Sequence, residues 1–292
     1  MNLLPHAFGL QCARPERLNA GHAPGGTRPA RPGAAVASLA HHTFLEAVRD
    51  KVLYLLLFFG IFVFGASRLL APLALGEGRR LTIDLGFTAI SAFGCLMTIF
   101  VGHQLIFREI ERKTMYFLLS RPLRRWEFVA GKYLGLASVL GLSVMVMGAL
   151  LGLLLGIVPG GAESLAFASF AGAVGLAVLE MTILAALAVL LAAVCSPYVA
   201  GLLTLGVWLI GHGSGDLKTW LQHESSPAIS ALAAAAAWVV PRLDLYGDVA
   251  PVLHGVAYPP AQLGWAACYA VLYATTALLA AALVLVRREF TL

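Results

Sequence analysis

The chain has 292 residues, of which 60% are hydrophobic and only 12% charged, and its formal net charge is +5. A soluble globular domain carries roughly 45–50% apolar and about 25% charged residues, so this composition excludes an ordinary water-soluble fold. The basic residues stand at the edges of apolar runs, as membrane orientation signals do, which argues against a nucleic-acid-binding surface. The four cysteines include no C-x-x-C pair, so we expect no disulfide framework and no metal site.

The first 38 residues differ from the rest of the chain. They are rich in Arg, Pro and Gly and show no apolar period, so they cannot bury enough surface to offset their ordering entropy. We predict a disordered cytoplasmic tail or an over-long reading frame, rather than a functional arm. Residues 39–292 then form a single membrane domain, which begins with an amphipathic helix over 41–51 that leads into the membrane.

Apolar runs set the predicted spans, because a helix needs about 20 apolar residues to cross a hydrocarbon core of ~30 Å. Six runs are candidate spans, of which the fifth is the shortest and weakest: about 52–75, 86–107, 133–158, 165–195, 198–212 and 262–286. A further run, 228–240, is stopped by Pro241 and is too short to cross alone, so we expect an outer re-entrant or interfacial helical segment before the last span. The predicted fold class is all-α and polytopic, with six transmembrane helices.

The distribution of Lys and Arg predicts the orientation. Of the 20 basic residues, 15 fall on the side that holds both termini and the loop between the second and third spans. The side rich in basic residues is cytoplasmic, so both termini are expected in the cytoplasm. A seventh crossing would place Arg287 and Arg288 outside, which argues against counting 228–240 as a span.

The loop after the second span is the most informative polar segment. As a helix over 108–120 it places Ile110, Thr114, Phe117 and Leu118 on one largely apolar stripe, and Pro122 stops it. The pattern predicts a short amphipathic helix on the cytoplasmic surface. From the residues alone, this helix could be held by lipid headgroups or could contact another protein.

Several short segments carry a family pattern. They are Glu111-Arg112-Lys113-Thr114, Leu118-Leu119-Ser120-Arg121-Pro122 with Arg125, Gly131-Lys132-Tyr133-Leu134-Gly135, and residues 44–54, 241–246 and 287–290. Together they resemble the permeases of type-2 ABC exporters over residues 39–292, with the branch associated with copper-enzyme maturation closest. One departure is Lys113, where the family commonly has glycine; helices prefer lysine to glycine, so we expect little effect.

The resemblance implies a permease subunit of an exporter, working as a homodimer in the bacterial plasma (inner) membrane. It makes 108–120 the coupling helix that contacts a separate P-loop ATPase. The residues that would make this contact are Glu109, Glu111, Arg112, Thr114 and Leu118.

The chain's own residues agree with a separate ATPase. Its only Gly-Lys pair, Gly131-Lys132, has Trp126 where a phosphate-binding loop needs its first glycine and Tyr133 where it needs a hydroxyl residue. We therefore expect ATP and Mg on the partner subunit and no catalytic residue or cofactor in this chain.

Two ionisable residues lie inside predicted spans. Glu180 falls in the middle of the fourth span, where a carboxylate costs about 2.5–3.5 kcal/mol on insertion scales, so it should be protonated, paired or facing a cavity. A hydrogen bond between helices and a role in the substrate path both remain open for Glu180. His103 lies near the inner end of the second span, where bonding at the membrane interface is the simpler interpretation.

Small residues suggest close helix packing on the third span. Gly148, Gly152 and Gly156 recur every four residues, a spacing that lets helices approach closely in lipid. Packing within the subunit and a dimer interface are both compatible with this spacing, and the first is favoured.

Three other functions can be considered from the remaining polar residues. Ser214 with His212, His223 and His254 could suggest an intramembrane hydrolase, but the local sequence does not match G-x-S-x-G. The same histidines fit no metal-ligand spacing and are expected to be solvated loop residues. A non-transporting membrane scaffold needs no chemistry and stays open, as does the substrate, whether lipid, polysaccharide, peptide, drug or a sulfur or copper species.

Overall fold

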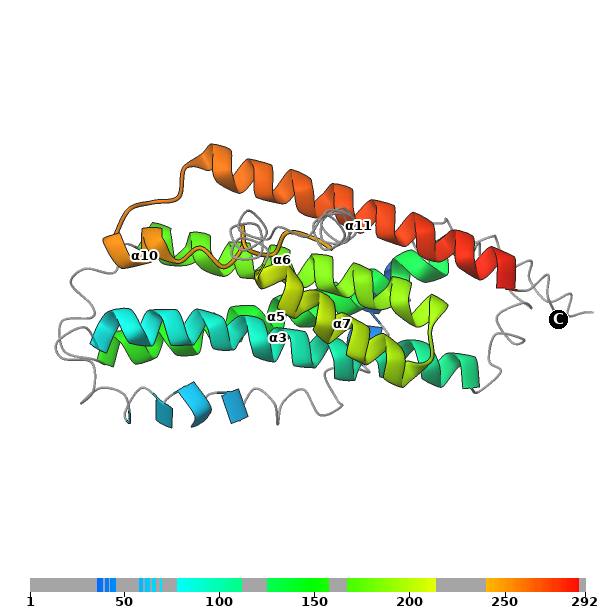
Figure 1. Ribbon diagram of the computed structural model, residues 1–292, viewed down its shortest axis with the longest axis horizontal. Helices are drawn as coiled ribbons and strands as arrows, with labels where there is room; N and C mark the ends of the chain where they lie inside the picture. The colour runs from blue at the N-terminus through cyan, green and yellow to red at the C-terminus, as the bar shows by residue number, and fades with distance from the viewer. Residues whose placement is uncertain are drawn as a thin grey trace, which may run out of the picture. The chain divides into compact units, whose positions relative to one another are not determined.

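The computed structural model describes one stretch near the N-terminus in fragments and four long segments continuously. The described residues are 36–38, 40–41, 43–45, 58–59, 61–63, 65–66, 69, 78–111, 125–157, 167–213 and 240–288. Every regular element among them is a helix, which confirms the predicted all-α class for this part of the chain (Figure 1). The helices are α3 (Gly78–Glu111), α5 (Arg125–Ile157), α6 (Phe167–Val194), α7 (Pro197–His212), α10 (Ala250–His254) and α11 (Pro260–Arg288).

Four of these helices contain segments long and apolar enough to cross a membrane. The segments are Arg80–Gly102, Val129–Gly156, Phe167–Val194 and Pro260–Val284, and they fall where the second, third, fourth and sixth spans were predicted. The predicted fifth span is helical as α7 but has only 16 residues. Most of the predicted first span, the segment 228–239 and residues 112–120 lie outside the described residues.

Helix α3 is longer than the apolar run that predicted it. It begins at Gly78, eight residues before the predicted start, and continues without a break to Glu111. Long charged side chains such as Arg80 can extend from a helix toward the headgroups, so polar residues at the membrane edge need not end it. The first four residues of the predicted coupling helix are therefore a continuation of α3.

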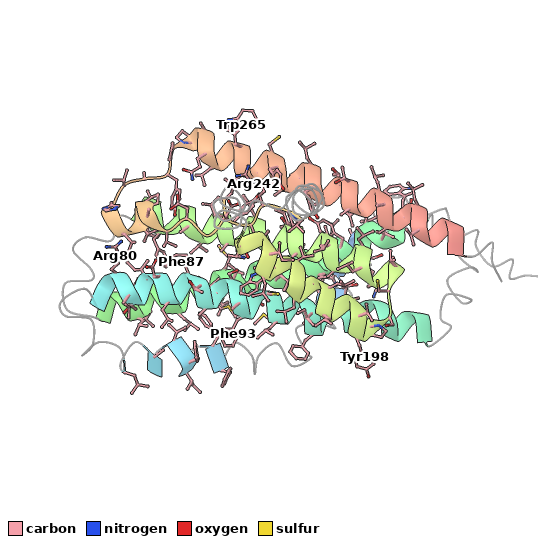
Figure 2. All side chains as sticks on the ribbon, in the orientation of Figure 1. Arg80, Phe87, Phe93, Tyr198, Arg242 and Trp265 are labelled. Atoms are coloured by element: carbon pink, nitrogen blue, oxygen red, sulfur yellow. The ribbon has the colours of Figure 1, made fainter. Side chains whose placement is uncertain are left out.

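Helix α6 is the centre of the described bundle. It contacts α3, α5, α7, α10 and α11, and 67% of its candidate span is buried, against 22% for α11. Its sequence is apolar on all sides, as expected for a helix surrounded by others. The outer face of the bundle carries exposed aromatic residues instead: Tyr198 and Trp265 project away from α7 and α11 (Figure 2).

The described N-terminal fragments pack against the bundle. Phe58, Phe59 and Phe62 place their rings 5.4–5.9 Å from the ring of Phe93 on α3. Edge-on and tilted aromatic pairs at such distances are favourable, so these contacts hold the three phenylalanines beside α3.

A non-helical segment, 240–249, follows the gap after α7 and packs on α11. Tyr246 donates a hydrogen bond to the Ala266 carbonyl at 2.8 Å, and the Arg242 backbone N–H donates to Tyr269 Oη at 3.1 Å. Backbone and side-chain polar groups at membrane depth have to find partners in the protein. These two bonds fix segment 240–249 against the N-terminal third of α11.

Candidate functional site

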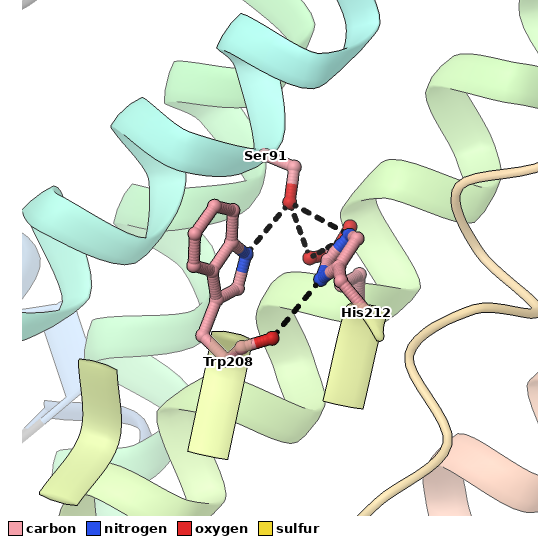
Figure 3. A network of polar contacts seen from close by, with 4 residues as sticks. Ser91, Trp208 and His212 are labelled. Carbon is pink, nitrogen blue, oxygen red and sulfur yellow. Dashed lines mark hydrogen bonds and ion pairs between the residues drawn. The ribbon is translucent and has the colours of Figure 1, made fainter. Parts of the chain in front are cut away.

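A cluster of four polar residues joins three helices inside the bundle. Ser91 comes from α3, Glu180 from α6, and Trp208 and His212 from α7 (Figure 3). We refer to these four residues as the polar cluster. Glu180 lies thirteen residues after Phe167 and fourteen before Val194, so the polar cluster sits at the middle of a candidate membrane span.

Helix lengths bring His212 to the same depth as Glu180. Only Cys195 and Ser196 separate α6 from α7, so the two helices run in opposite directions from a common turn. His212 is the last residue of α7, fifteen residues from its start at Pro197. At about 1.5 Å per residue, His212 rises roughly as far from the turn as Glu180 does on α6.

Glu180 is fully buried and accepts a strong hydrogen bond. Its side chain is 1% exposed, and Ser91 Oγ donates to Glu180 Oε1 at 2.6 Å. A buried carboxyl group without partners is costly in a membrane. The bond from Ser91 supplies a partner and also ties α3 to α6.

Ser91 is the hub of the polar cluster. Besides bonding Glu180, its Oγ accepts the indole N–H of Trp208 at 2.9 Å and lies 3.3 Å from His212 Nε2. A hydroxyl has one proton to donate and two lone pairs that accept. The proton and both lone pairs of the Ser91 hydroxyl therefore face partners within the polar cluster.

His212 connects the polar cluster to the end of α7. Its Nε2 is 3.6 Å from Glu180 Oε1, an ion-pair distance, and its Nδ1 is 3.3 Å from the Trp208 carbonyl oxygen. The side chain is 28% exposed, so it is the member of the polar cluster most open to the surroundings. The expectation that His212 is a solvated loop residue is wrong, because α7 continues to this residue and brings it into contact with α3 and α6.

Segment 240–249 places more polar groups beside the polar cluster. Asp244 interacts electrostatically with His212 and lies 3.9 Å from Arg242, while its Oδ1 is buried without a hydrogen-bond partner. Burial raises the pKa of Tyr246 well above its ordinary value, with Tyr269 and Glu180 acting in the same direction. Tyr246 thus remains a neutral hydrogen-bond donor at physiological pH.

The other predicted site residues are placed only in part. Glu109 and Glu111 lie at the C-terminal end of α3 and His103 lies further back on the same helix, but their side chains are not among those described. Arg112, Thr114 and Leu118 lie outside the described residues.

The three glycines of α5 differ from one another. A Cβ at Gly148 would lie 2.8 Å from Val174 Cγ2, and one at Gly152 would lie 3.3 Å from Phe170 Cε1, both on α6. A Cβ at Gly156 would meet nothing within 4 Å. The first two glycines thus line the contact between α5 and α6 within one subunit.

Glu180 can be identified from the sequence, but Ser91 and Trp208 cannot. A serine or tryptophan in an apolar helix is too common to mark a site. The only usable signal in the sequence is the short apolar run of α7. Because this helix ends halfway across the membrane, its last residue, His212, reaches the depth of Glu180.

The arrangement does not match a serine hydrolase. In a Ser-His-acid triad the histidine stands between the serine and the acid, so that its Nδ1–H bonds the acid. Here Glu180 bonds Ser91 directly, and His212 Nδ1 faces the Trp208 carbonyl. Among the described residues, no three His, Cys, Asp or Glu side chains are grouped so that they could hold a metal ion.

A family model described as "ABC-2 family transporter protein" matches residues 37–285. No curated protein matches the chain. The matched range includes most of the described helical bundle and the whole of the predicted coupling segment.

Proposed function

Because the chain belongs to the ABC-2 transporter family, we propose that it is the permease subunit of an ABC exporter driven by a separate ATPase subunit. Family membership makes it a multi-pass membrane protein and the membrane component of an ABC transporter. What we propose beyond family membership is that transport is outward and that the ATPase is a separate subunit. The motif resemblance over residues 39–292 supports both.

The observation that carries the proposal is the continuity of α3. This helix runs without interruption from Gly78 through Ser91 to Glu111. At about 1.5 Å per residue, the twenty residues from Ser91 to Glu111 span roughly 30 Å. A push on the end of α3 at Glu111 can therefore be transmitted directly to the polar cluster.

Residues 108–120 act as the coupling segment in this proposal. Glu109, Glu111, Arg112, Thr114 and Leu118 contact the ATPase, which binds ATP and Mg. Both charged and apolar residues are present in this segment, as needed for a polar rim and an apolar centre of a protein contact. ATP binding and hydrolysis move the segment, and α3 carries the movement into the membrane.

The proposed assembly is a homodimer of permeases in the bacterial plasma membrane. Each copy has six spans with both termini in the cytoplasm, which follows the excess of basic residues on that side. The substrate path runs between the two copies. The resemblance over residues 39–292 is closest to the branch associated with copper-enzyme maturation, and we include that branch in the proposal.

A pull-down of the tagged full chain in mild detergent tests the proposal. We expect a P-loop ATPase to co-purify in a stoichiometric amount, and Glu111→Lys to reduce its recovery at least about tenfold by reversing a contact charge. Asp84→Lys is the matched control, since Asp84 is an exposed carboxylate near the opposite end of α3. This control should leave ATPase recovery unchanged.

A second variant separates binding from coupling. Thr114→Pro should interrupt the coupling helix without changing charge, so ATP hydrolysis continues but no longer depends on transport. The proposal fails if a folded chain brings down no ATPase, an outcome that would favour a membrane scaffold. It also fails if Glu111→Lys and Asp84→Lys behave alike.

A further inference from the structure

The hydrogen-bond donors and acceptors of the polar cluster determine where its protons can lie. Ser91 has a single hydroxyl proton, and the 2.6 Å bond to Glu180 Oε1 uses it. Ser91 Oγ then faces the Trp208 N–H as an acceptor and can only accept from His212 Nε2. In this arrangement His212 Nε2 has to carry a hydrogen.

The other ring nitrogen of His212 also faces an acceptor. Nδ1 lies 3.3 Å from the Trp208 carbonyl oxygen, which has only lone pairs to offer. With Glu180 ionised, both ring nitrogens thus face oxygen acceptors, and only the imidazolium form satisfies both. The position at the C-terminal end of α7 favours a cation as well, because helix carbonyls carry partial negative charge there.

A second arrangement holds the same number of protons. Glu180 can carry the proton and donate it to Ser91, while Ser91 donates to His212 Nε2 and Nδ1–H donates to the Trp208 carbonyl. The two arrangements interconvert when His212 Nε2–H gives its proton to Ser91 Oγ and the Ser91 proton passes to Glu180 Oε1. Two O–H or N–H bonds break and two form, and the polar cluster stays neutral.

Removing or adding a proton leaves partners unmatched. Without the shared proton, the Glu180 carboxylate remains in the membrane as a net negative charge, and one nitrogen of His212 points its lone pair at an oxygen. With an extra proton, Ser91 Oγ is surrounded by donors from Glu180, Trp208 and His212, and its own hydrogen has no acceptor. Both states also place a net charge at mid-membrane, which is costly.

Three other ionisable groups lie around the polar cluster. Cys95 on α3 lies near Glu180 and is buried. Tyr246 in segment 240–249 faces Glu180 and keeps its proton because burial raises its pKa. Asp244 faces His212 and lies 3.9 Å from Arg242, so it is the neighbouring carboxyl group that can bias where the shared proton sits.

We propose that Ser91, Glu180 and His212 form a binding site for a single proton at the middle of the membrane. Glu180 on α6 and His212 on α7 share the proton through the Ser91 hydroxyl on α3. Moving α3 withdraws that hydroxyl and removes the hydrogen-bonded bridge between Glu180 and His212, which allows the proton to leave. The link between this site and transport rests on the proposed function, whereas the site itself does not.

Infrared difference spectroscopy of the full chain in lipid nanodiscs tests the site. Spectra recorded as the pH is changed follow the carboxyl C=O stretch and the imidazole bands, and Glu180→Gln identifies the band of Glu180. Because interacting groups titrate as a pair, we expect His212→Gln to shift the midpoint of the Glu180 band by at least about one pH unit. An unchanged midpoint in His212→Gln overturns the proposal.

Substitutions at Ser91 keep the test decisive if the charge variants fold poorly. Ser91→Ala should shift the same midpoint, and Ser91→Thr, which retains a hydroxyl, should restore it. Ser143→Ala is the control, because Ser143 is a buried serine that bonds the Val139 carbonyl of its own helix. The proposal is overturned if Ser91→Ala and Ser143→Ala give the same spectra as the wild-type chain.

The titration contains no ATPase, so its failure overturns the proton site and leaves the proposed function standing. If an ATPase does co-purify, the pH profile of its hydrolysis tests the link to transport. We expect Ser91→Ala to displace that profile by about one pH unit relative to Ser91→Thr. Coincident profiles would overturn the link.

Discussion

Gly135 on α5 and Thr43 in the N-terminal segment are so close that a Cβ atom at Gly135 would lie 2.5 Å from Thr43 Cβ. The same atom would lie 3.0 Å from the Ala40 carbonyl oxygen, and Thr43 is 0% exposed. Only glycine permits this approach. The contact holds Ala40 and Thr43 against α5.

Replacing this glycine should loosen the N-terminal segment. We expect Gly135→Ala to lower stability by about 1–3 kcal/mol, since overpacking forces backbone shifts, and to lower the thermal midpoint of the detergent-solubilised chain. Gly156→Ala on the same helix is the control, because a Cβ there meets nothing within 4 Å. Equal midpoints for the two variants would contradict the close contact.

A second tight contact lies between α7 and segment 240–249. A Cβ at Gly211 would lie 2.8 Å from Leu243 Cγ and 3.0 Å from the Pro241 carbonyl oxygen. Gly211→Ala should therefore push segment 240–249 away from α7 and speed hydrogen exchange of its backbone amides, measured by mass spectrometry. Gly206→Ala on α7, where a Cβ has open space, should leave exchange in this segment unchanged.

The hydrogen bond from Tyr246 to α11 can be removed without changing shape. Tyr246→Phe deletes the donor to the Ala266 carbonyl, and a typical intramolecular hydrogen bond contributes about 0.5–1.5 kcal/mol. We expect the thermal midpoint to fall by an amount that corresponds to this range. Tyr198→Phe should have no effect, because the Tyr198 side chain is 90% exposed.

The raised pKa of Tyr258 predicts that the folded chain loses stability at alkaline pH. Burial, with Asp248 acting in the same direction, raises the pKa of Tyr258 from 10.0 to about 12, and its hydroxyl donates to the Asp248 carbonyl at 2.5 Å. The folded state thus holds this proton more tightly than the unfolded state, so its contribution is complete below pH 10 and is lost as the pH rises toward 12.

The measurement compares wild-type and Tyr258→Phe chains by thermal unfolding between pH 9 and 12. The midpoint of the wild-type chain should fall more steeply over this range than that of Tyr258→Phe, because the variant has no phenol to ionise. Parallel curves would show that Tyr258 does not hold its proton in the folded state. Tyr198→Phe, at an exposed position, should follow the wild-type curve.

The spans of α5, α6 and α11 were predictable because each is a long apolar run, and apolar length is what the membrane selects. The ends of α3 were not, because Arg80 at one end and Glu109 and Glu111 at the other are polar residues that a hydropathy pattern assigns to loops. A helix continues through such residues when its backbone bonds are maintained and the side chains reach water. Helix length at membrane edges therefore exceeds apolar length.

The polar cluster shows what a single sequence leaves open. Glu180 is identifiable because a carboxylate within an apolar run is costly wherever it points. Ser91 lies 89 residues away from it and His212 another 32 residues beyond it, and nothing local marks them as partners. Their meeting depends on how α3, α6 and α7 rotate and on where α7 ends.

The shortness of α7 also bears on how the chain enters the bilayer during synthesis. At 16 residues, or about 24 Å, α7 falls short of a hydrocarbon core of about 30 Å, so it is a weak insertion signal by itself. Because Cys195 and Ser196 alone connect it to α6, we expect the translocon to release α6 and α7 together as one hairpin. Glu180 would then leave the channel with His212 already beside it, and the membrane would never receive the carboxylate without its partner.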